Sequence, residues 1–456
     1  MTSNPSHKVP VSRVLCMVRQ QEEFFRYVCP RVFEGDILYL NEYRAGAGLN
    51  LMERFYRLWR RGGGKSLPAE RVEDIIRRDR VLRTLPRAKA ARMVGAMALA
   101  LDHILDETQP ALFIAKPVDN YIADLMYEEL ERRDIARFGM GAHVLNGYSR
   151  AHIRGEYVRT RETDDREIEA AVSQLATDNF RPNFAIYKDL SLGVHLDKWA
   201  RLNLKRAGYA LKRLAERDYL NFEYLSVGPR IIRRTLMSYS GIHYFSRDWK
   251  ARAARSGKPV VYLPLHCWPE ITVDYWLSNY EFADYETGVA RMVEALSKRF
   301  FVLVKEHPWE AGGRPVEFYQ ALIEWGATLI PAFTHSGEVV NASDYALVAN
   351  STVGIEAALR GKRVITLERP SYFVPELFHA VDTMEDVDAL TPEILEARPL
   401  PPLDEARRML MKHILEGCFE GDFLTLDYMK PENLEIVARS LRRFINSPLF
   451  PWGKVS

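Results

Sequence analysis

The chain has 456 residues, of which 47% are apolar and 27% are charged, and its formal net charge is +2. This composition excludes a mostly disordered protein, and the length predicts two or three domains because one ordinary core does not grow this large. The cysteines show neither metal-ligand spacing nor a disulfide framework, which indicates a reducing compartment. They are Cys16, Cys29, Cys267 and Cys418. The first ten residues are polar, and the most apolar stretch, 93–105, is too short to span a bilayer. We therefore expect a cytoplasmic protein that can meet a membrane only at its surface.

Strands and helices alternate through the first part of the chain. Short apolar runs predict strands, and apolar residues recurring every three to four positions predict helices. The predicted elements are strand 12–18, a helix through Phe25 and Val28, strand 37–40, helix 90–105, strand 111–115, helix 123–133 and strand 135–144. This alternation predicts a parallel α/β domain over residues 1–163.

Residues 164–257 have a helical pattern with no convincing strand, which predicts an insertion or a bridge between two α/β domains. From residue 197 to residue 258 there are fifteen Lys and Arg against five Asp and Glu, a local excess of ten positive charges. Such a run can be a solvated helical face, or it can bind an anionic partner such as phospholipid headgroups, a lipid-linked phosphate or an acidic glycan. No nucleic-acid-binding signature accompanies the basic run, so a nucleic acid is not expected.

The strand–helix alternation returns over residues 258–400. The predicted elements are strand 260–265, helix 288–298, strand 300–304, helix 316–325, strand 328–330, helix 337–342, strand 345–349, helix 354–360 and strand 363–367. Residues 401–456 add helices at 405–415 and 431–445, which we expect to cross back to the first domain. The predicted fold is α/β, with two Rossmann-like lobes in a GT-B arrangement and a helical insertion or bridge between them.

Two motifs follow predicted strands of the second lobe. Lys305, Glu306, His307 and Pro308 follow the strand at 300–304, where open α/β sheets bind ligands. His307 can be a structural histidine, or as an imidazolium it can bind a phosphate and stabilise charge on a departing nucleotide.

The second motif begins a helix after the strand at 345–349. Its candidate nucleotide- and phosphate-binding residues are Asn350, Ser351, Thr352, Gly354 and Glu356, together with Lys305 and His307 from the first motif. Ser351 and Thr352 suit a helix N-cap, and N–H groups left free at a helix start also bind anions. Gly354 would let a ligand approach the backbone, and Glu356, expected in the first turn, is either a ribose ligand or a solvated acid favoured by the helix dipole.

A third group follows the strand at 260–265. His266 and Glu270, with Trp268 between them, are candidates for contacts with a donor sugar or a base. Trp268 can also serve only in packing.

Together these three segments resemble the bacterial capsular polysaccharide biosynthesis family. In chain order they are Pro264-Leu265-His266-Cys267-Trp268-Pro269-Glu270, the segment 305–308 and the segment that begins at Asn350. That family includes β-Kdo transferases and is similar to bacterial sialyltransferases. The resemblance covers residues 260–367 well and the first half only in outline. It implies a metal-independent, inverting GT-B enzyme that uses a CMP-activated ulosonic acid, with His307, Ser351 and Thr352 on the CMP phosphate. His266 replaces the glutamine of the Kdo transferase motif, which leaves the donor sugar open.

An inverting transfer also requires a general base for the acceptor hydroxyl. Asp119, after the strand at 111–115, is the candidate, although it also suits a helix N-cap at residue 121; Glu22, after the first strand, is the reserve. No Asp-x-Asp element indicates a catalytic metal, and no cofactor beyond the CMP-sugar donor substrate is expected.

The predicted function is therefore a glycosyltransferase of bacterial surface polysaccharide or glycoconjugate synthesis, acting on a glycan, glycolipid or protein acceptor at the inner face of the cytoplasmic membrane. One alternative is a UDP-sugar-using transferase or a UDP-sugar 2-epimerase, although the Gly-Gly pair of the epimerase motif does not follow Ser351. The other is a polysaccharide export or binding factor without catalysis. Function does not follow from fold, so the alternatives stay open at this point.

Overall fold

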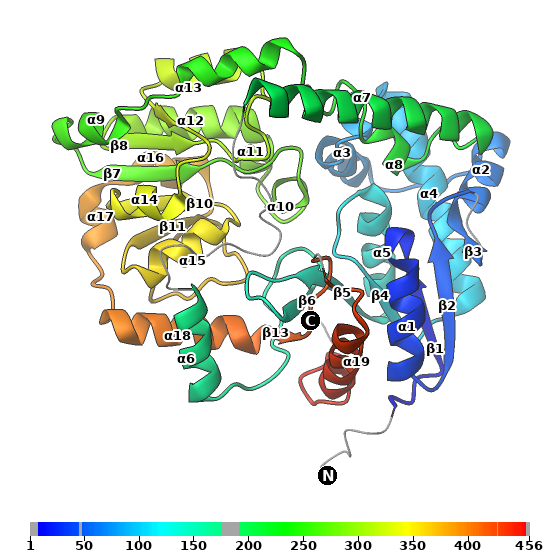
Figure 1. Cartoon of the computed structure of the whole chain (residues 1–456). Coiled ribbons are helices and arrows are strands. Elements are labelled where there is room, and N and C mark those ends of the chain that lie inside the picture. The colour runs from blue at the N-terminus through cyan, green and yellow to red at the C-terminus, as the bar shows by residue number, and fades with distance from the viewer. Residues whose placement is uncertain (1–7, 45–47, 176–190, 426, 453–456) are drawn as a thin grey trace. The chain divides into compact units, whose positions relative to one another are not determined.

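The computed structural model describes residues 8–44, 48–175, 191–425 and 427–452. The chain divides into two compact units, each with one largely parallel sheet (Figure 1). The first unit comprises Met1–Glu162, Lys205–Ile231 and Glu416–Ser456, and the second comprises Thr163–Leu204 and Ile232–Leu415. The predicted helical segment 164–257 is thus shared between the units, and the predicted segment 401–456 divides at Glu416. The α/β class and the two Rossmann-like sheets agree with the prediction from the sequence.

The first unit contains a seven-stranded sheet in the order β13-β6-β5-β4-β1-β2-β3. The strands are β1 (Arg13–Met17), β2 (Asp36–Asn41), β3 (Leu49–Asn50), β4 (Leu112–Ala115), β5 (Ala136–Ala142), β6 (Tyr148–His152) and β13 (Cys418–Glu420). Strands β1 to β5 are parallel, and β6 and β13 add antiparallel strands at one edge. The chain runs from β1 toward β2 and β3 and later returns to β4 on the other side of β1. The topological switch point, where open α/β sheets bind ligands, therefore lies between β1 and β4.

The last helix of the chain completes the core of the first unit. Helix α19 (Pro431–Ile445) packs on α1 (Glu22–Val32), and the ring of Phe24 lies 4.8 Å from that of Phe423, measured between centroids. Each such buried aromatic side chain contributes roughly 1.5–3 kcal/mol relative to an exposed one. The remaining helices of this unit are α2 (Leu51–Arg61), α3 (Ala69–Arg78), α4 (Arg87–Thr108), α5 (Tyr121–Arg132), α8 (Phe222–Leu225), η1 (Arg19–Gln21) and η2 (Leu82–Thr84).

The second unit contains a six-stranded parallel sheet in the order β12-β11-β10-β7-β8-β9. The strands are β7 (Val260–Pro264), β8 (Phe301–Lys305), β9 (Thr328–Ile330), β10 (Tyr345–Val348), β11 (Arg363–Leu367) and β12 (Phe378–Val381). The chain runs from β7 to β8 and β9, then returns to β10 on the other side of β7. The switch point of this sheet therefore lies between β7 and β10.

Helices cover both faces of the second sheet, which is why its central strands are apolar throughout (Figure 1). The helices of this unit are α6 (Asp165–Leu175), α9 (Trp249–Arg255), α10 (Ile271–Asp274), α11 (Tyr280–Ala283), α12 (Tyr285–Ser297), α13 (Val316–Glu324), α14 (Ser336–Asn341), α15 (Thr352–Leu359), α16 (Met384–Ala389), α17 (Pro392–Glu396), α18 (Leu403–Glu416) and η3 (Met237–Tyr244). Helix α7 (Leu192–Ala215) contributes residues to both units.

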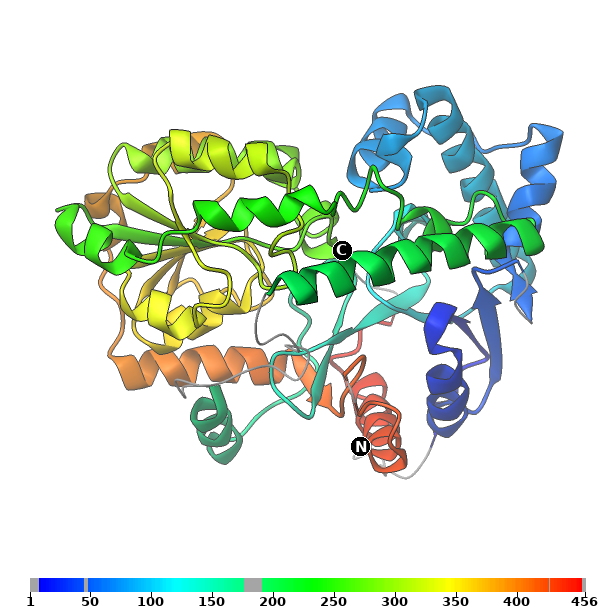
Figure 2. The same ribbon diagram turned by 45° about the horizontal axis from the view of Figure 1, so that its top comes forward.

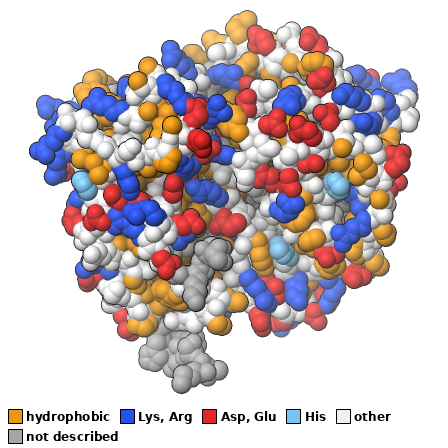
Figure 3. Space-filling view, turned by 180° about the vertical axis from the view of Figure 1, so that it is seen from behind, with side chains coloured by type: hydrophobic (Ala, Val, Ile, Leu, Met, Phe, Trp, Pro, Cys, Tyr) orange, Lys and Arg blue, Asp and Glu red, His pale blue; other side chains and the backbone are white. Residues whose placement is uncertain are grey.

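Four short strands were not predicted from the sequence: β3, β6, β12 and β13. Strands β3 and β13 have only two and three residues, and polar residues interrupt the apolar ones in β6 and β12. The described part of segment 164–257 contains no strand, as predicted. On the face shown in Figure 3, acidic and basic side chains are interspersed, which is consistent with the small net charge.

Candidate functional site

The three predicted motifs of the second unit follow three adjacent parallel strands. His266 follows β7, His307 follows β8, and Ser351 follows β10, and these strands are neighbours in the order β10-β7-β8. Because parallel strands present their carboxyl ends at one edge, the motifs share the edge that contains the switch point between β7 and β10. We call this set of residues the second-unit site.

His307 is an exposed residue at this edge. Its Nδ1 accepts from the Trp309 backbone N–H at 3.2 Å and lies 3.0 Å from the Cys267 Sγ. Since Nδ1 accepts, the ring proton of the neutral imidazole is assigned to Nε2. Burial, aided by the nearby cations Lys305, Arg314 and Lys198, lowers the pKa of His307 to about 4. The residue is nevertheless exposed to solvent, and a bound anion would raise this pKa, so the imidazolium stays a prediction.

His266 is a buried residue. Only 8% of the residue is exposed, and burial lowers the pKa of its ring to about 3. The Nε2 atom is buried without a hydrogen-bond partner among the described residues. An orphaned buried nitrogen costs roughly 1–3 kcal/mol, so its retention at the switch point is consistent with a ligand that satisfies it.

Glu270 precedes the short helix α10 and accepts from the Thr272 hydroxyl at 3.0 Å. It is half-buried in the same loop as His266. The structure thus brings Glu270 and His266 to one loop after β7, as the sequence predicted.

A buried ion pair that the sequence did not reveal holds both histidine loops. Glu306 accepts from the Arg314 Nε at 2.6 Å, from the Tyr319 hydroxyl at 2.8 Å and from the His307 backbone N–H at 2.6 Å. Arg314 also donates to the His266 carbonyl. The side chains of Glu306 and Arg314 are 0% and 2% exposed, so the pair is removed from water and its loss would be strongly destabilising. The only hint in the sequence was that Glu306 and His307 are consecutive residues after a strand. Successive side chains of an extended segment point to opposite sides, so one of the two would point into the core.

Lys305 is the last residue of β8 and is almost buried, whereas the sequence placed it after the strand. Burial lowers its pKa to about 8, and the carboxylates of Glu356 and Glu306 oppose this shift. Glu356 accepts from the Ser336 hydroxyl at 3.0 Å, and burial raises its pKa. Glu356 lies in the second turn of α15, not in the first as predicted, because the helix begins at Thr352. Glu356 is half-buried and Lys305 influences its pKa, so Glu356 is not the solvated acid of the second alternative.

Ser351 is the N-cap of α15, as predicted: its side chain accepts from the Val353 N–H at 3.2 Å. Asn350 and Thr352 flank it at the sheet edge and are neither fully buried nor fully exposed. The interpretation of Gly354 changes. A Cβ at this position would lie 2.8 Å from the Tyr372 hydroxyl and 3.0 Å from the Val348 side chain. Gly354 is therefore required by packing inside the unit, and its role in ligand approach stays a prediction.

Two further basic residues of the second unit approach the His307 loop. Arg234 donates to the carbonyls of Trp309, at 3.0 Å, and Ala311, at 3.2 Å. Lys198, on α7, lies 3.5 Å from the Trp309 carbonyl through its Nζ, and burial lowers its pKa to about 8. Arg234 and Lys198 lie within the basic run predicted for residues 197–258, which also includes exposed cations discussed below.

The predicted base, Asp119, belongs to an ion-pair cluster at the switch point of the first sheet. Arg19, after β1, donates to Asp119, after β4, at 2.5 Å and to Glu42, after β2, at 2.6 Å. Although burial lowers the pKa of Arg19, Asp119 and Glu42 raise it above its ordinary value, so the guanidinium stays charged. Arg19 has a φ of +41°, a conformation that costs a non-glycine residue energy and is concentrated at functional sites. We call Arg19, Glu42 and Asp119 the first-unit cluster.

The N-cap alternative for Asp119 is wrong. Asn120 is the N-cap of α5, and its side chain accepts from the N–H groups of Ile122 and Ala123. The Asp119 carboxylate therefore does not cap the helix, and it accepts a hydrogen bond from Arg19 instead. The reserve candidate, Glu22, lies outside the cluster and accepts from Arg26 at 2.8 Å along α1.

A small hollow of about 10 Å³, room for about one water molecule, adjoins the first-unit cluster. Its walls combine carboxylates, a guanidinium and aromatic rings, the groups with which proteins bind hydroxyl-rich molecules. They are Arg19, Glu42, Tyr43, Ile122, Asn221, Phe222 and Glu223. The sequence missed Arg19 and Glu42; the position of each directly after a predicted strand was the available signal.

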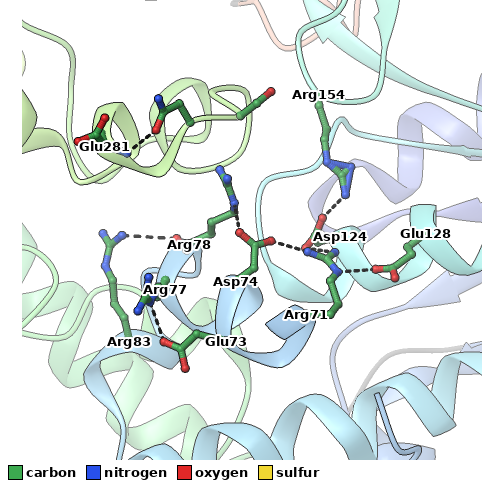
Figure 4. Close-up of polar contacts among 12 residues, drawn as sticks. Arg71, Glu73, Asp74, Arg77, Arg78, Arg83, Asp124, Glu128, Arg154 and Glu281 are labelled. Carbon is green, nitrogen blue, oxygen red and sulfur yellow. Dashed lines mark hydrogen bonds and ion pairs between the residues drawn. The ribbon is translucent and has the colours of Figure 1, made fainter. Parts of the chain in front are cut away.

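A second ion-pair cluster in the first unit is structural (Figure 4). The buried carboxylate of Asp124, on α5, is shared by Arg71, on α3, and Arg154, and Arg71 also pairs with Asp74 and Glu128. All these guanidiniums are matched by carboxylates within the unit, and the contacts hold α3 against α5. Its charges are paired within the unit, so we do not assign it a ligand.

Neither protein-family models nor curated protein sequences match this chain. Solved structures resemble it at low identity. A β-Kdo 2,7 transferase, KpsC of Thermosulfurimonas dismutans, is 10% identical with a TM-score of 0.39, over 94% of this chain and 98% of that chain. A glycosyltransferase from Rickettsia africae is 10% identical with a TM-score of 0.29, over 96% and 99%. A UDP-GlcNAc 2-epimerase from Neisseria meningitidis is 11% identical with a TM-score of 0.27, over 89% and 100%. At TM-scores below 0.5, these likenesses do not establish an activity, so the function is argued from the site.

Proposed function

We propose that this protein is an inverting glycosyltransferase that transfers a sugar from a nucleotide-sugar donor bound at the second-unit site. The observation that supports the proposal is the convergence of His266, His307 and the N-cap of α15 at one switch point. A helix start and neutral N–H donors bind phosphate oxygens, and here they lie on adjacent strands.

The donor would be a CMP-sugar, with Kdo or another ulosonic acid as the sugar. In this step the bond between the anomeric carbon and the phosphate oxygen breaks, and the electron pair leaves with CMP. The N–H of His307, the start of α15 and the ammonium of Lys305 would stabilise the charge that develops on that oxygen, which removes the need for a divalent ion. Asn350, Ser351 and Thr352 would contact the phosphate, Glu356 the ribose, and His266 and Glu270 the sugar or the base.

The proton of the acceptor hydroxyl would pass to Asp119 as the new glycosidic bond forms at the anomeric carbon. Arg19 fixes the position of this carboxylate through the 2.5 Å contact. The hollow lined by Tyr43, Asn221 and Glu223 would receive the acceptor hydroxyl, and the rest of a glycan, glycolipid or protein acceptor would lie outside it.

The test is calorimetric binding of CMP, UDP and GDP to the wild-type protein and to His307→Ala, without added metal. Selective CMP binding that weakens in the variant supports the proposal. The control is His103→Ala, an exposed histidine of α4 in the first unit, which should bind as the wild type does. Selective UDP binding would favour a UDP-sugar transferase or 2-epimerase, and incubation with UDP-GlcNAc alone would separate these two because an epimerase needs no acceptor. Binding of no nucleotide would contradict the proposal and favour an export or binding factor.

A further inference from the structure

Helix α7 exposes a row of leucines that nothing in the described structure covers. It has 24 residues, and about 36 Å of length follows from the helical rise. Figure 2 shows it as one continuous helix. The exposed fractions of its leucines are large, reaching 75% at Leu204 and 68% at Leu211. The full row is Leu192, Leu196, Leu204, Leu211 and Leu214.

The row is one face of the helix. At 100° per residue these five leucines fall within an arc of about 120°. The face next to Leu192 is attached to the protein by polar contacts: His195, fully buried, bonds the Thr235 carbonyl at 3.0 Å, and Arg206 donates to the Val227 carbonyl at 2.8 Å. Arg213, on that same face, donates to the Tyr219 carbonyl at 3.0 Å. The leucines therefore point outward because the neighbouring face of the helix is fixed.

Positive charge borders the leucine row. The helix carries six Lys and Arg and a single acidic residue, Asp197, which pairs with Arg201 at 2.8 Å. On the helical wheel the exposed Arg201, Lys205 and Lys212 form a strip that begins about 60° beyond Leu204, the leucine at one edge of the row. None of the helices in the described parts of the chain combines the length and apolar character needed to cross a membrane.

We propose that α7 is a docking surface for an anionic lipid membrane, with its leucines entering the boundary between headgroups and acyl chains. An apolar face bordered by Lys and Arg has the chemistry of helices that lie in a membrane interface, where apolar burial and attraction to anionic lipids add. A protein that bound this face instead would have to supply both an apolar groove for the leucines and acidic residues for the Lys and Arg. From the sequence, the whole basic segment 197–258 was a candidate binding site for an anionic partner, and the proposal assigns this binding to one face of α7. It does not depend on the proposed function.

The test is co-sedimentation of the full chain with vesicles, without any activity measurement. Vesicles of phosphatidylcholine with phosphatidylglycerol are compared with vesicles of phosphatidylcholine alone, at low and high salt. We expect binding to the anionic vesicles, weaker binding at high salt, and little binding to the neutral ones. The double variant Leu204→Glu, Leu211→Glu should partition about tenfold or more weakly, because it places two carboxylates at the apolar boundary.

Matched controls separate this face from the rest of the surface. Ile394→Glu with Leu403→Glu changes two leucine-sized side chains that are 45% and 40% exposed on other helices, and should bind like the wild type. Lys205→Gln with Lys212→Gln should weaken binding to anionic vesicles, whereas Lys298→Gln with Lys430→Gln should not.

Three results would overturn the proposal: no binding to anionic vesicles, equal loss in the Ile394 and Leu403 variant, or equal binding to neutral vesicles. A dimer of the wild-type chain in solution that Leu204→Glu, Leu211→Glu converts to a monomer would assign the face to a second copy and also overturn it. Circular dichroism of each variant verifies that the fold is retained.

Discussion

The two sheets have the same kind of switch point but place opposite chemistry there. The first-unit cluster combines two carboxylates with one guanidinium, so it can hold a proton acceptor in position. The second-unit site combines two histidines, a buried lysine and a helix start, so it can hold an anion. The comparison shows that one topology supplies the location, while the residue after each strand determines the chemistry.

Replacing the proton acceptor of the first unit should have the largest effect. Asp119→Asn keeps the shape of the side chain but cannot accept a proton, so we expect kcat to fall about 10³-fold with nucleotide affinity unchanged. Initial-rate kinetics and calorimetry measure the two quantities. Glu22→Gln is the matched control because Glu22 is a carboxylate of the same unit that pairs only along its own helix. A normal kcat in Asp119→Asn together with a reduced kcat in Glu22→Gln would contradict the assignment and make Glu22 the general base.

Removing the hydrogen-bond donor His307 from the second unit should lower kcat less than Asp119→Asn does, and it should also weaken nucleotide binding. His307→Ala deletes one N–H from the second-unit site, and loss of a single such donor typically lowers kcat by about 10²-fold. We expect kcat/KM and CMP affinity to fall together, unlike in Asp119→Asn. A variant that loses rate with full CMP affinity would place His307 away from the phosphate.

Much of the fold could be predicted from the sequence because its central strands are buried on both faces and form plain apolar runs. Strands 328–330 and 363–367 were predicted with the bounds that the structure has. Strand β6 could not be predicted, since Tyr148–His152 contains no apolar run. The position of each motif after its strand was likewise visible in the sequence.

The side-chain partners within the candidate site could not be predicted. Nothing local in the sequence announces that Glu306 pairs with Arg314 or that Arg19 bridges Glu42 and Asp119, because these residues meet only in the folded sheet. The same holds for the pKa of His307, which is lowered by burial of its ring and by the cations Lys305, Arg314 and Lys198, the last of them distant in sequence. Protonation states depend on solvent access, which has no signature in spacing.

The pH dependence of nucleotide binding should sharpen the second half of the comparison. Burial lowers the pKa of Lys305 to about 8, so above pH 8 the ligand-free site loses its ammonium charge. An anion that binds the charged form must then bring a proton with it, so CMP affinity should fall by up to about tenfold per pH unit above 8. Calorimetry between pH 7 and pH 9.5 measures this slope. Lys305→Met should bind CMP more weakly at pH 7 and lose the slope; a slope that persists in this variant would assign it to another group, of which Lys198 is the candidate.

The smallest effect should come from Gly354, and it separates packing from ligand approach at the start of α15. The Cβ of Gly354→Ala would lie 2.8 Å from the Tyr372 hydroxyl, so we expect a loss of about 1–3 kcal/mol in the free energy of unfolding. Denaturant unfolding of the variant measures this loss, and calorimetry measures its affinity for CMP.

Tyr372→Phe removes the hydroxyl that this Cβ would meet, along with the hydrogen bond from that hydroxyl to the Ser351 carbonyl at 2.8 Å. If packing against Tyr372 is what requires glycine, the double variant should lose less stability than the sum of the two single variants, because the same contact is relieved once. If Gly354 instead admits the nucleotide, Gly354→Ala should weaken CMP binding with or without the tyrosine hydroxyl. Additive losses of stability with reduced CMP affinity would therefore restore the interpretation that the sequence first suggested for this residue.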